Sequence, residues 1–278
     1  MALRITVGLV SAAIFLTGCL YSFWTALIVA GVANIIAQHE FCRIVPRVPA
    51  RDCWIFVGWS TAAFLAAALC LAGHLHGAWL AAILAFIALY YALVAIVTYE
   101  RDGEAWEQWT LLRSLLLVTL PLAFLPAVAC DSSRFPFFFL LMGASWGADT
   151  GAIFAGKALG RRKLAPRISP NKTVEGALGG MISAGAVWAL AGAIYPLPPA
   201  WTAVFPGWQA PVWIILLFIA GAVVAVPGVA GDLTFSLFKR QAGIKDYGRI
   251  LPGHGGILDR FDSLFFIAPL IYLLSLGA

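Results

Sequence analysis

The segment 231–262 combines acidic, basic and glycine residues in a way that suits the binding of a cation together with phosphate groups. It holds four acids, five bases and one histidine within 32 residues. If residues 232–240 are helical, Asp232, Ser236 and Lys239 share one face, because they lie at positions i, i+4 and i+7. That face would present a carboxylate, a hydroxyl and an ammonium group. Carboxylates share Mg²⁺ with bound phosphates, and Lys and Arg neutralise the remaining phosphate oxygens.

A glycine-rich run, Pro252–Gly256, interrupts any regular helix in this segment. Its glycines allow backbone N–H groups to turn toward an anion, and their presence around His254 favours a residue of the site over a structural histidine. We expect a helix to restart near Ile257 and to place Asp259 and Asp262 on one side. These residues predict a pocket in which positioning and charge stabilisation promote a phosphoryl-type transfer.

A second carboxylate, Asp149, lies in an apolar segment, where an ionisable group is costly and often functional. Gly143, Gly147 and Gly151 recur every four residues on the same helix face. Small residues at this spacing allow two helices to approach closely. The segment is either a packing face with a hydrogen-bonded aspartate or a carboxylate held near a substrate, and both interpretations stay open.

A third polar stretch begins at Ser169 and Pro170, which fit the N-cap and the first residue of a helix. The predicted helix would enter the membrane there. Its free N–H groups would face an anion beside the basic residues of 157–172. The alternative is a capped loop whose basic charge serves only membrane orientation.

The composition indicates that these residues belong to a membrane protein and not to a soluble domain. Of 278 residues, 62% are hydrophobic and 11% are charged, whereas a soluble domain has about 25% charged residues. Continuous apolar runs near the roughly 20 residues needed to cross a bilayer favour helices over a barrel. The net charge is +5, but eleven of the 18 Lys and Arg residues lie in 157–172 and 231–262. We interpret them as a phosphate-binding face, and expect no nucleic-acid partner because no soluble module is visible.

The sequence therefore predicts an all-α, polytopic integral membrane protein with about eight or nine transmembrane helices. The first two spans could form one bent hairpin or one long helix, and we expect them to be retained rather than processed as a signal. The candidate spans are 5–18, 20–37, 54–72, 78–98, 111–129, 136–155, 174–195, 211–228 and 263–277.

Basic loops assign the orientation, because cytoplasmic loops carry an excess of Lys and Arg. The basic segments 43–53, 99–110, 157–172 and 231–262 would all lie inside. We expect a single membrane domain, 1–278, with N-terminal helical hairpins over 1–135 and a catalytic half over 136–278. The expected location is the cell inner (cytoplasmic) membrane, with multiple passes and a site that faces the cytoplasm.

The segment 236–262 resembles the signature of the phosphatidate cytidylyltransferase (CDP-diacylglycerol synthase) family at every constrained position. Residues 149–152 and 169–176 also resemble that family. The matching pattern is Ser236-x-Phe238-Lys239-Arg240, four further residues, then Lys245-Asp246-x-Gly248-x-x-Leu251-Pro252-x-His254-Gly255-Gly256-Ile257-x-Asp259-Arg260-Phe261-Asp262.

The resemblance implies CTP and phosphatidate as substrates, CDP-diacylglycerol and pyrophosphate as products, and an active site open to the cytoplasm and to membrane lipid. It implies Mg²⁺, with room for a monovalent cation such as K⁺. By the same resemblance, Asp232 and Asp259 are the preferred metal ligands, followed by Asp246 and Asp262. The residues expected to carry catalysis are Asp232, Asp259, Lys239, Arg240 and His254. The residues expected to bind substrate are Ser169, Lys172, Thr173, Ser236, Lys245, Gly255, Gly256 and Arg260.

Two positions depart from the family pattern. Phe235 replaces an expected acid and Ile153 replaces an expected tyrosine. The first change leaves open a relative that uses a different lipid phosphate. The alternatives to a cytidylyltransferase are a CTP-dependent polyprenol or lipid kinase and a non-enzymatic lipid or anion transporter. The glycine-rich helix face is also compatible with a homodimer.

Overall fold

The protein is an all-α, polytopic membrane protein. The computed structural model describes residues 2–45, 48–77, 106–129, 135–195, 209–250 and 255–276, together with Ile87, Leu89, Tyr91 and Thr202. Within these ranges, six helices are long and apolar enough to cross a membrane, and a shorter apolar helix covers Val10–Tyr21. The predicted span 78–98 lies outside the described residues apart from three positions.

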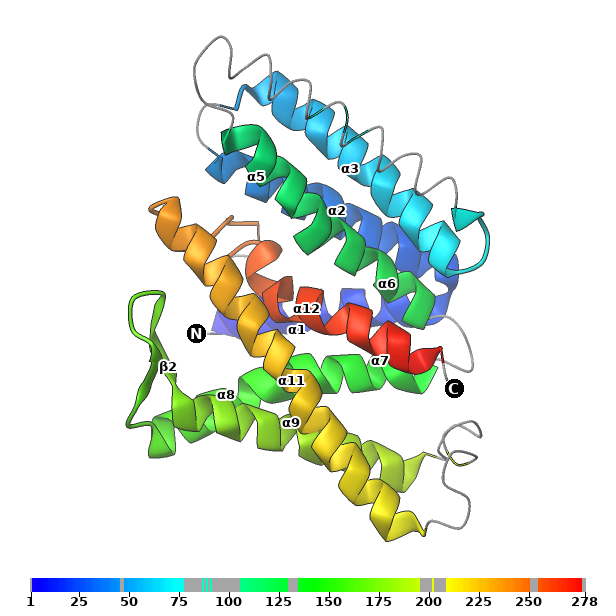
Figure 1. The fold of residues 1–278 in the computed structure, drawn as a ribbon, viewed down its shortest axis with the longest axis vertical. Coiled ribbons are helices and arrows are strands. Elements are labelled where there is room, and N and C mark those ends of the chain that lie inside the picture. Colours follow the sequence, from blue (N-terminus) through cyan, green and yellow to red (C-terminus); the bar gives the residue numbers. More distant parts are fainter. Residues whose placement is uncertain are drawn as a thin grey trace. The chain divides into compact units, whose positions relative to one another are not determined.

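The chain forms two compact units, each built from segments that are distant in the sequence (Figure 1). Unit 1 comprises Met1–Cys130 and Ala242–Phe261, and unit 2 comprises Asp131–Gln241 and Asp262–Ala278. The single membrane domain expected from the sequence stays a prediction.

Unit 1 is a helical bundle in which α2 packs against its neighbours α1, α3 and α6. Ser22 has an extended backbone and caps α2 by accepting a hydrogen bond from the Thr25 N–H at 3.2 Å. The first two apolar runs are therefore two helices that break at Ser22. The described helices of this unit are α1 (Ala2–Tyr21), α2 (Phe23–Ile44), α3 (Ala50–Leu71), α5 (Trp106–Ser114), the π-helical turn η1 (Leu115–Thr119) and α6 (Leu120–Ala129).

Buried polar side chains cross-link α2 to the π-helical turn. Gln38 Nε2 donates to the Ser114 carbonyl at 3.1 Å and to Thr119 Oγ1 at 2.7 Å. Thr119 Oγ1 donates in turn to Asn34 Oδ1 at 3.0 Å. All four side chains are buried. Since a buried polar group is costly unless it is hydrogen-bonded, these contacts fix the register of α2 against η1.

Unit 2 is built around α9, which packs against α8 and α11. The first residues of α12 belong to unit 1, and the helix from Asp262 onward belongs to unit 2. Its described elements are α7 (Phe135–Met142), the π-helical turn η2 (Gly143–Gly147), α8 (Ala148–Leu159), β1 (Lys163–Ala165), β2 (Ser169–Thr173), α9 (Val174–Ile194), α11 (Ala210–Gln241) and α12 (Leu258–Ser275).

Glycines bring α8 and α9 into close contact. A Cβ at Gly151 would overlap the Ser183 side chain and lie 2.8 Å from the Gly179 carbonyl oxygen, and a Cβ at Gly180 would lie 2.7 Å from the Ala148 carbonyl oxygen. The helix face predicted from the glycine spacing is therefore confirmed as a packing face against α9.

The helix predicted to begin at Ser169 and Pro170 is wrong. These residues belong to β2, which pairs antiparallel with β1 in the register Lys163–Thr173 and Ala165–Ser169. A residue before proline favours extended backbone, and proline is tolerated on an edge strand, so the same dipeptide suits a strand. Thr173 is the actual N-cap, with Oγ1 accepting from the Gly176 N–H at 3.0 Å.

The span predicted at 211–228 is too short. Helix α11 continues to Gln241, and Pro227 lies inside it. The extension carries Asp232, Ser236 and Lys239 on a helix, as their spacing predicts. The predicted helix restart near Ile257 is also confirmed, because α12 begins at Leu258.

We predict opposite effects of the same substitution at two helical glycines. Gly151→Ala should destabilise the protein by about 1–3 kcal/mol, because its Cβ overlaps α9. Gly58→Ala in α3 has no atom within 4 Å of the added Cβ and should stabilise the protein by about 0.5–1 kcal/mol through helix propensity. Thermal unfolding in detergent measures both. Equal shifts for the two variants would contradict the packing account.

Candidate active site

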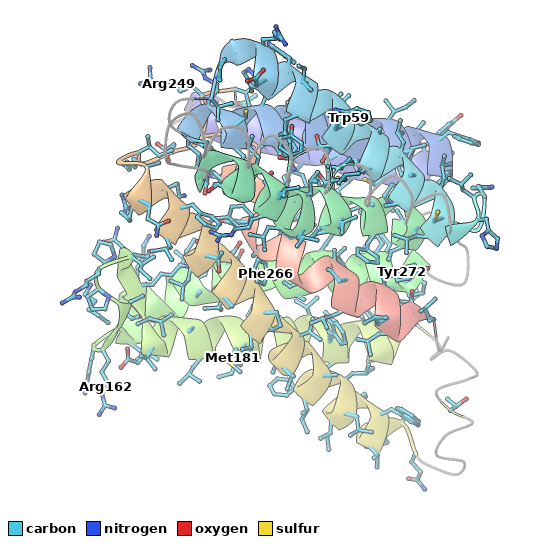
Figure 2. All side chains as sticks on the ribbon, turned by 45° about the horizontal axis from the view of Figure 1, so that its top comes forward. Trp59, Arg162, Met181, Arg249, Phe266 and Tyr272 are labelled. Carbon is cyan, nitrogen blue, oxygen red and sulfur yellow. The ribbon has the colours of Figure 1, made fainter. Side chains whose placement is uncertain are left out.

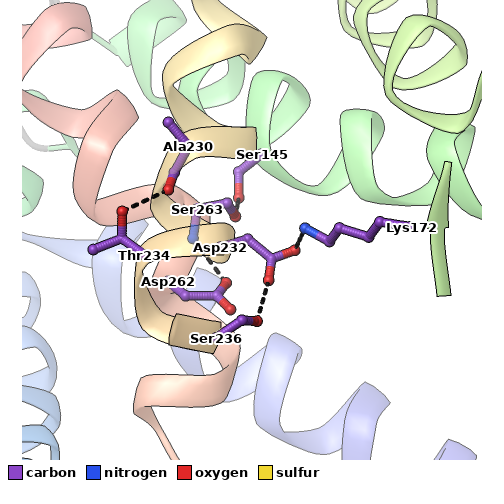
Figure 3. A network of polar contacts seen from close by, with 8 residues as sticks. All are labelled: Ser145, Lys172, Ala230, Asp232, Thr234, Ser236, Asp262 and Ser263. Atoms are coloured by element: carbon purple, nitrogen blue, oxygen red, sulfur yellow. Dashed lines mark hydrogen bonds and ion pairs between the residues drawn. The ribbon is translucent and has the colours of Figure 1, made fainter. Parts of the chain in front are cut away.

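Asp232 is the centre of a polar network in unit 2 (Figure 3). Its Oδ2 forms an ion pair with Lys172 Nζ, and its Oδ1 accepts a hydrogen bond from Ser236 Oγ at 3.4 Å. The Lys172 and Asp232 side chains are 27% and 23% exposed. Partial burial strengthens an ion pair relative to one in water, while the remaining exposure leaves the charges open to an incoming polar ligand.

Lys172 lies on the β-hairpin, which holds its ammonium group beside the Asp232 carboxylate. Lys172 precedes Thr173, whose side chain caps α9, so the lysine is fixed between a strand and a helix start. The Glu175 carboxylate accepts the backbone N–H groups of Arg161 at 3.0 Å and Arg162 at 3.1 Å and so holds the base of the hairpin. Arg240 Nε donates to the Ile168 carbonyl at 3.1 Å and ties the hairpin turn to the end of α11.

Exposed basic side chains cover the hairpin. Figure 2 shows Arg162 pointing away from the ribbon, in agreement with its exposed position. No acid occurs in the hairpin sequence from Arg161 to Lys172. A rigid cationic element beside Asp232 suits a ligand with several negative charges. The exposed basic residues are Arg161, Arg162, Lys163 and Arg167.

A second acid, Asp262, enters the same network from α12. Its Oδ1 accepts from the Ser263 N–H at 2.7 Å, and Ser263 Oγ shares a hydrogen bond of 2.9 Å with Ser145 Oγ in η2. The negative charges of Asp232 and Asp149 repel the Asp262 carboxylate, and the positive charge of Lys239 attracts it. The Asp262 carboxylate is therefore within electrostatic range of two further acids and one lysine of unit 2.

A close approach of two helices makes this arrangement possible. A Cβ at Gly231 would lie 2.5 Å from the Asp262 carbonyl oxygen and 2.8 Å from the Phe266 ring. Glycine at this position therefore allows the start of α12 within unit 2 to lie against α11.

The hydroxyl pair of Ser145 and Ser263 carried no signal in the sequence, because single serines in apolar helices have no characteristic spacing.

Phe235, which replaces the expected acid, has a packing role. Its side chain is fully buried, with its ring 5.2 Å from that of Phe265 and 6.2 Å from that of Phe238. A carboxylate at this position would be removed from water among aromatic rings, at considerable cost. The aromatic cluster instead fixes α11 against α12 one turn beyond Asp232.

Other predicted residues lie in unit 1. Asp259 Oδ2 accepts the backbone N–H groups of Tyr247 and Gly256, each at 2.9 Å, and so closes the loop between α11 and α12. Gly255 has a φ of +83°, which favours glycine, and a Cβ there would lie 2.7 Å from Asp259 Oδ2. Lys245 and Asp246 are exposed.

The structure thus brings together some predicted residues and leaves the roles of others as predictions. Lys172, Asp232 and Ser236 form one polar network in unit 2, and Asp262 lies within electrostatic range of Asp232 and Lys239. The predicted sharing of a metal by Asp232 and Asp259 stays a prediction, since the two lie in different units. His254 lies outside the described residues. The roles assigned to Ser169, Thr173, Arg240, Gly255, Gly256 and Arg260 also stay predictions.

The donor set is compatible with Mg²⁺. The part of the chain that the structure describes contains no group of three or more His, Cys, Asp or Glu side chains arranged to hold a metal. Mg²⁺, however, is usually bound through one or two carboxylates, while water and phosphate oxygens supply the other ligands. Asp232 and Asp262 could supply such a pair of carboxylates.

Comparison with known proteins agrees with this chemistry. The phosphatidate cytidylyltransferase of Bacillus subtilis (strain 168) is 46% identical over 129 residues, which cover 46% of this chain and 43% of the relative. Those of Staphylococcus saprophyticus and Staphylococcus aureus (strain COL) are 45% and 46% identical over 129 residues, which cover 45% of each relative. The alignments thus span less than half the length of these relatives. The sequence model of the cytidylyltransferase family matches residues 2–276, and the chain therefore belongs to the cytidylyltransferase family.

Proposed function

We propose that this protein is a phosphatidate cytidylyltransferase, which transfers CMP from CTP to phosphatidate and releases pyrophosphate. The observation that carries the proposal is the Lys172–Asp232 ion pair with Ser236 and Asp262, built from three separate segments of a helical membrane protein. Membership of the cytidylyltransferase family and the names of the relatives support it.

In the proposed reaction, a phosphate oxygen of phosphatidate attacks the α-phosphorus of CTP. The new P–O bond forms as the bond to the β-phosphate breaks, and pyrophosphate leaves with the electron pair. A phosphomonoester is largely dianionic at neutral pH, since its second pKa is about 6, so the attack needs no strong general base. The protein must chiefly bring two polyanions together.

The side chains of unit 2 are suited to this task. Lys172 and Lys239 would neutralise phosphate oxygens, and the exposed arginines of the hairpin would attract the anionic substrates. Asp232 and Asp262 would hold Mg²⁺, which when bound would offset the negative charge of the triphosphate and of the departing pyrophosphate. Ser236 would keep the Asp232 carboxylate oriented through its hydrogen bond.

We place the site at the cytoplasmic face of the cell inner membrane, where its basic loops would lie by the positive-inside rule. Membrane lipid would then reach the site laterally and CTP from the aqueous side. A monovalent cation such as K⁺ is a further part of the proposal, motivated by the family resemblance. The homodimer expected from the glycine-rich helix face is not supported by that face, because Gly143, Gly147 and Gly151 pack against α9 of the same chain.

We predict that the purified protein, given labelled CTP and phosphatidate with Mg²⁺, produces lipid-soluble label and one pyrophosphate per transfer. Removal of Mg²⁺ by a chelator should abolish both signals. Release of CDP in place of pyrophosphate would identify a lipid kinase instead. The absence of CTP turnover, combined with lipid or anion movement in vesicles, would identify a transporter.

We predict that Asp232→Asn lowers kcat by a factor of about 100 or more, because it removes a carboxylate that would hold Mg²⁺ at the triphosphate. Thr234→Val is a matched control on the same helix, since the Thr234 hydroxyl donates within its own helix, to the Ala230 carbonyl 2.8 Å away. The control should keep near-native turnover. Equal activity of the two variants in the same transfer assay would refute the assignment of Asp232.

A further inference from the structure

A buried carboxylate in the N-terminal half of the chain bonds directly to the start of α12. Glu40, near the end of α2, is 6% exposed. Its two oxygens accept the consecutive backbone N–H groups of Ile257 at 3.2 Å and Leu258 at 3.0 Å. All of these residues belong to unit 1. The N-terminus of a helix stabilises a negative charge, because its N–H groups are unpaired and its dipole is positive there.

Two glycines of the same loop make room for this carboxylate. A Cβ at Gly248 or at Gly256 would overlap the Glu40 carboxyl group. The neighbouring aromatic rings extend the contact, because Phe41 stacks on Tyr247 with ring centroids 6.5 Å apart and ring planes 17° apart. The end of α2 therefore supports the loop that connects α11 to α12.

A second carboxylate binds other N–H groups of this loop. Asp259 accepts from Tyr247 and Gly256, and Glu40 accepts from Ile257 and Leu258. Together the two acids satisfy four backbone donors of one irregular segment. Burial of a carboxylate is unfavourable unless charge-assisted hydrogen bonds offset its lost hydration. Glu40 thus holds the residues that immediately precede Asp259 and Arg260.

We propose that Glu40 is a positioning residue for the transfer reaction. It fixes the start of α12 and the glycine loop, and with them the backbone of Asp259 and Arg260, for which the family resemblance implies roles in metal and substrate binding. This inference rests on the proposed function. It also assigns a role to the N-terminal half, in which the sequence showed only apolar hairpins. Misplacement of a reacting group by about 1 Å can lower a rate about 100-fold.

The test compares Glu40→Gln with Thr119→Val in the full-length protein. Glutamine keeps the shape of the side chain but replaces one acceptor oxygen with an NH₂ group that cannot accept a hydrogen bond. Thr119→Val breaks the buried Gln38 network of the same unit and serves as a control for general destabilisation. Three quantities are measured for each variant: the hydrogen-exchange rate of a peptide that contains Ile257 and Leu258, kcat, and KM for CTP.

We expect Glu40→Gln to raise the exchange rate of these amides at least tenfold and to lower kcat at least tenfold. KM for CTP should change less than kcat. Thr119→Val should lower the unfolding temperature while leaving both the local exchange and kcat near native. The proposal is overturned if exchange in Glu40→Gln stays native, or if turnover stays within twofold of the wild type.

A double-mutant comparison supplies a readout that does not need activity. Gly248→Ala should lower the unfolding temperature in the wild-type background, because the added Cβ meets the Glu40 carboxyl group. In a Glu40→Ala background the same change should have a smaller effect. Additive effects would argue against the contact. If the wild type shows no CTP-dependent transfer, the proposed function fails, while exchange and this comparison still test the Glu40 contact.

Discussion

Two opposite charges, those of Lys172 in the β-hairpin and Asp232 in α11, meet at a partly buried position in unit 2. Each would be less stable there without the other, because a charge that is partly removed from water is costly unless it is paired. The hairpin, the N-cap of α9 and the extension of α11 together bring the two side chains within ion-pair distance. In the proposed function, the same two charges would be shared with a cation and with phosphate oxygens. An ion pair that is only partly buried suits such an exchange of partners, because water and ligands can reach it.

Glycine allows the close contacts behind this arrangement. Gly151 and Gly180 allow α8 and α9 to touch through backbone atoms, and Gly231 does the same for α11 and the start of α12 within unit 2. Around the loop before α12, glycines create space for carboxylates instead of for another helix. The loop N–H groups there bond to Glu40 and Asp259, so that an irregular segment has defined hydrogen-bond partners. One residue type thus serves helix packing in one unit and loop anchoring in the other.

Patterns with short sequence separation predicted much of this structure. The apolar runs predicted helices, the spacing of Asp232 and Ser236 predicted a shared helix face, and Gly151 predicted a close helix contact. The errors arose where one local pattern fits two conformations: Ser169–Pro170 suits a helix start and also an edge strand, and only the pairing with β1 decides. Long-range contacts gave no signal at all. Glu40 lies 217 residues from Ile257, and Ser145 lies 118 residues from Ser263, so neither pair could be inferred from spacing.

The central claim is that the Asp232 carboxylate binds the cation that accompanies CTP. The most direct measurement is a titration with Mn²⁺, which prefers the same oxygen ligands as Mg²⁺. Electron paramagnetic resonance detects the bound and the free Mn²⁺. The sample contains the protein and a CTP analogue with a methylene group between its α- and β-phosphates, so that no turnover occurs. The account predicts nucleotide-dependent Mn²⁺ binding to the wild type and an affinity at least ten times lower in Asp232→Asn. Equal affinity in the two proteins would contradict it.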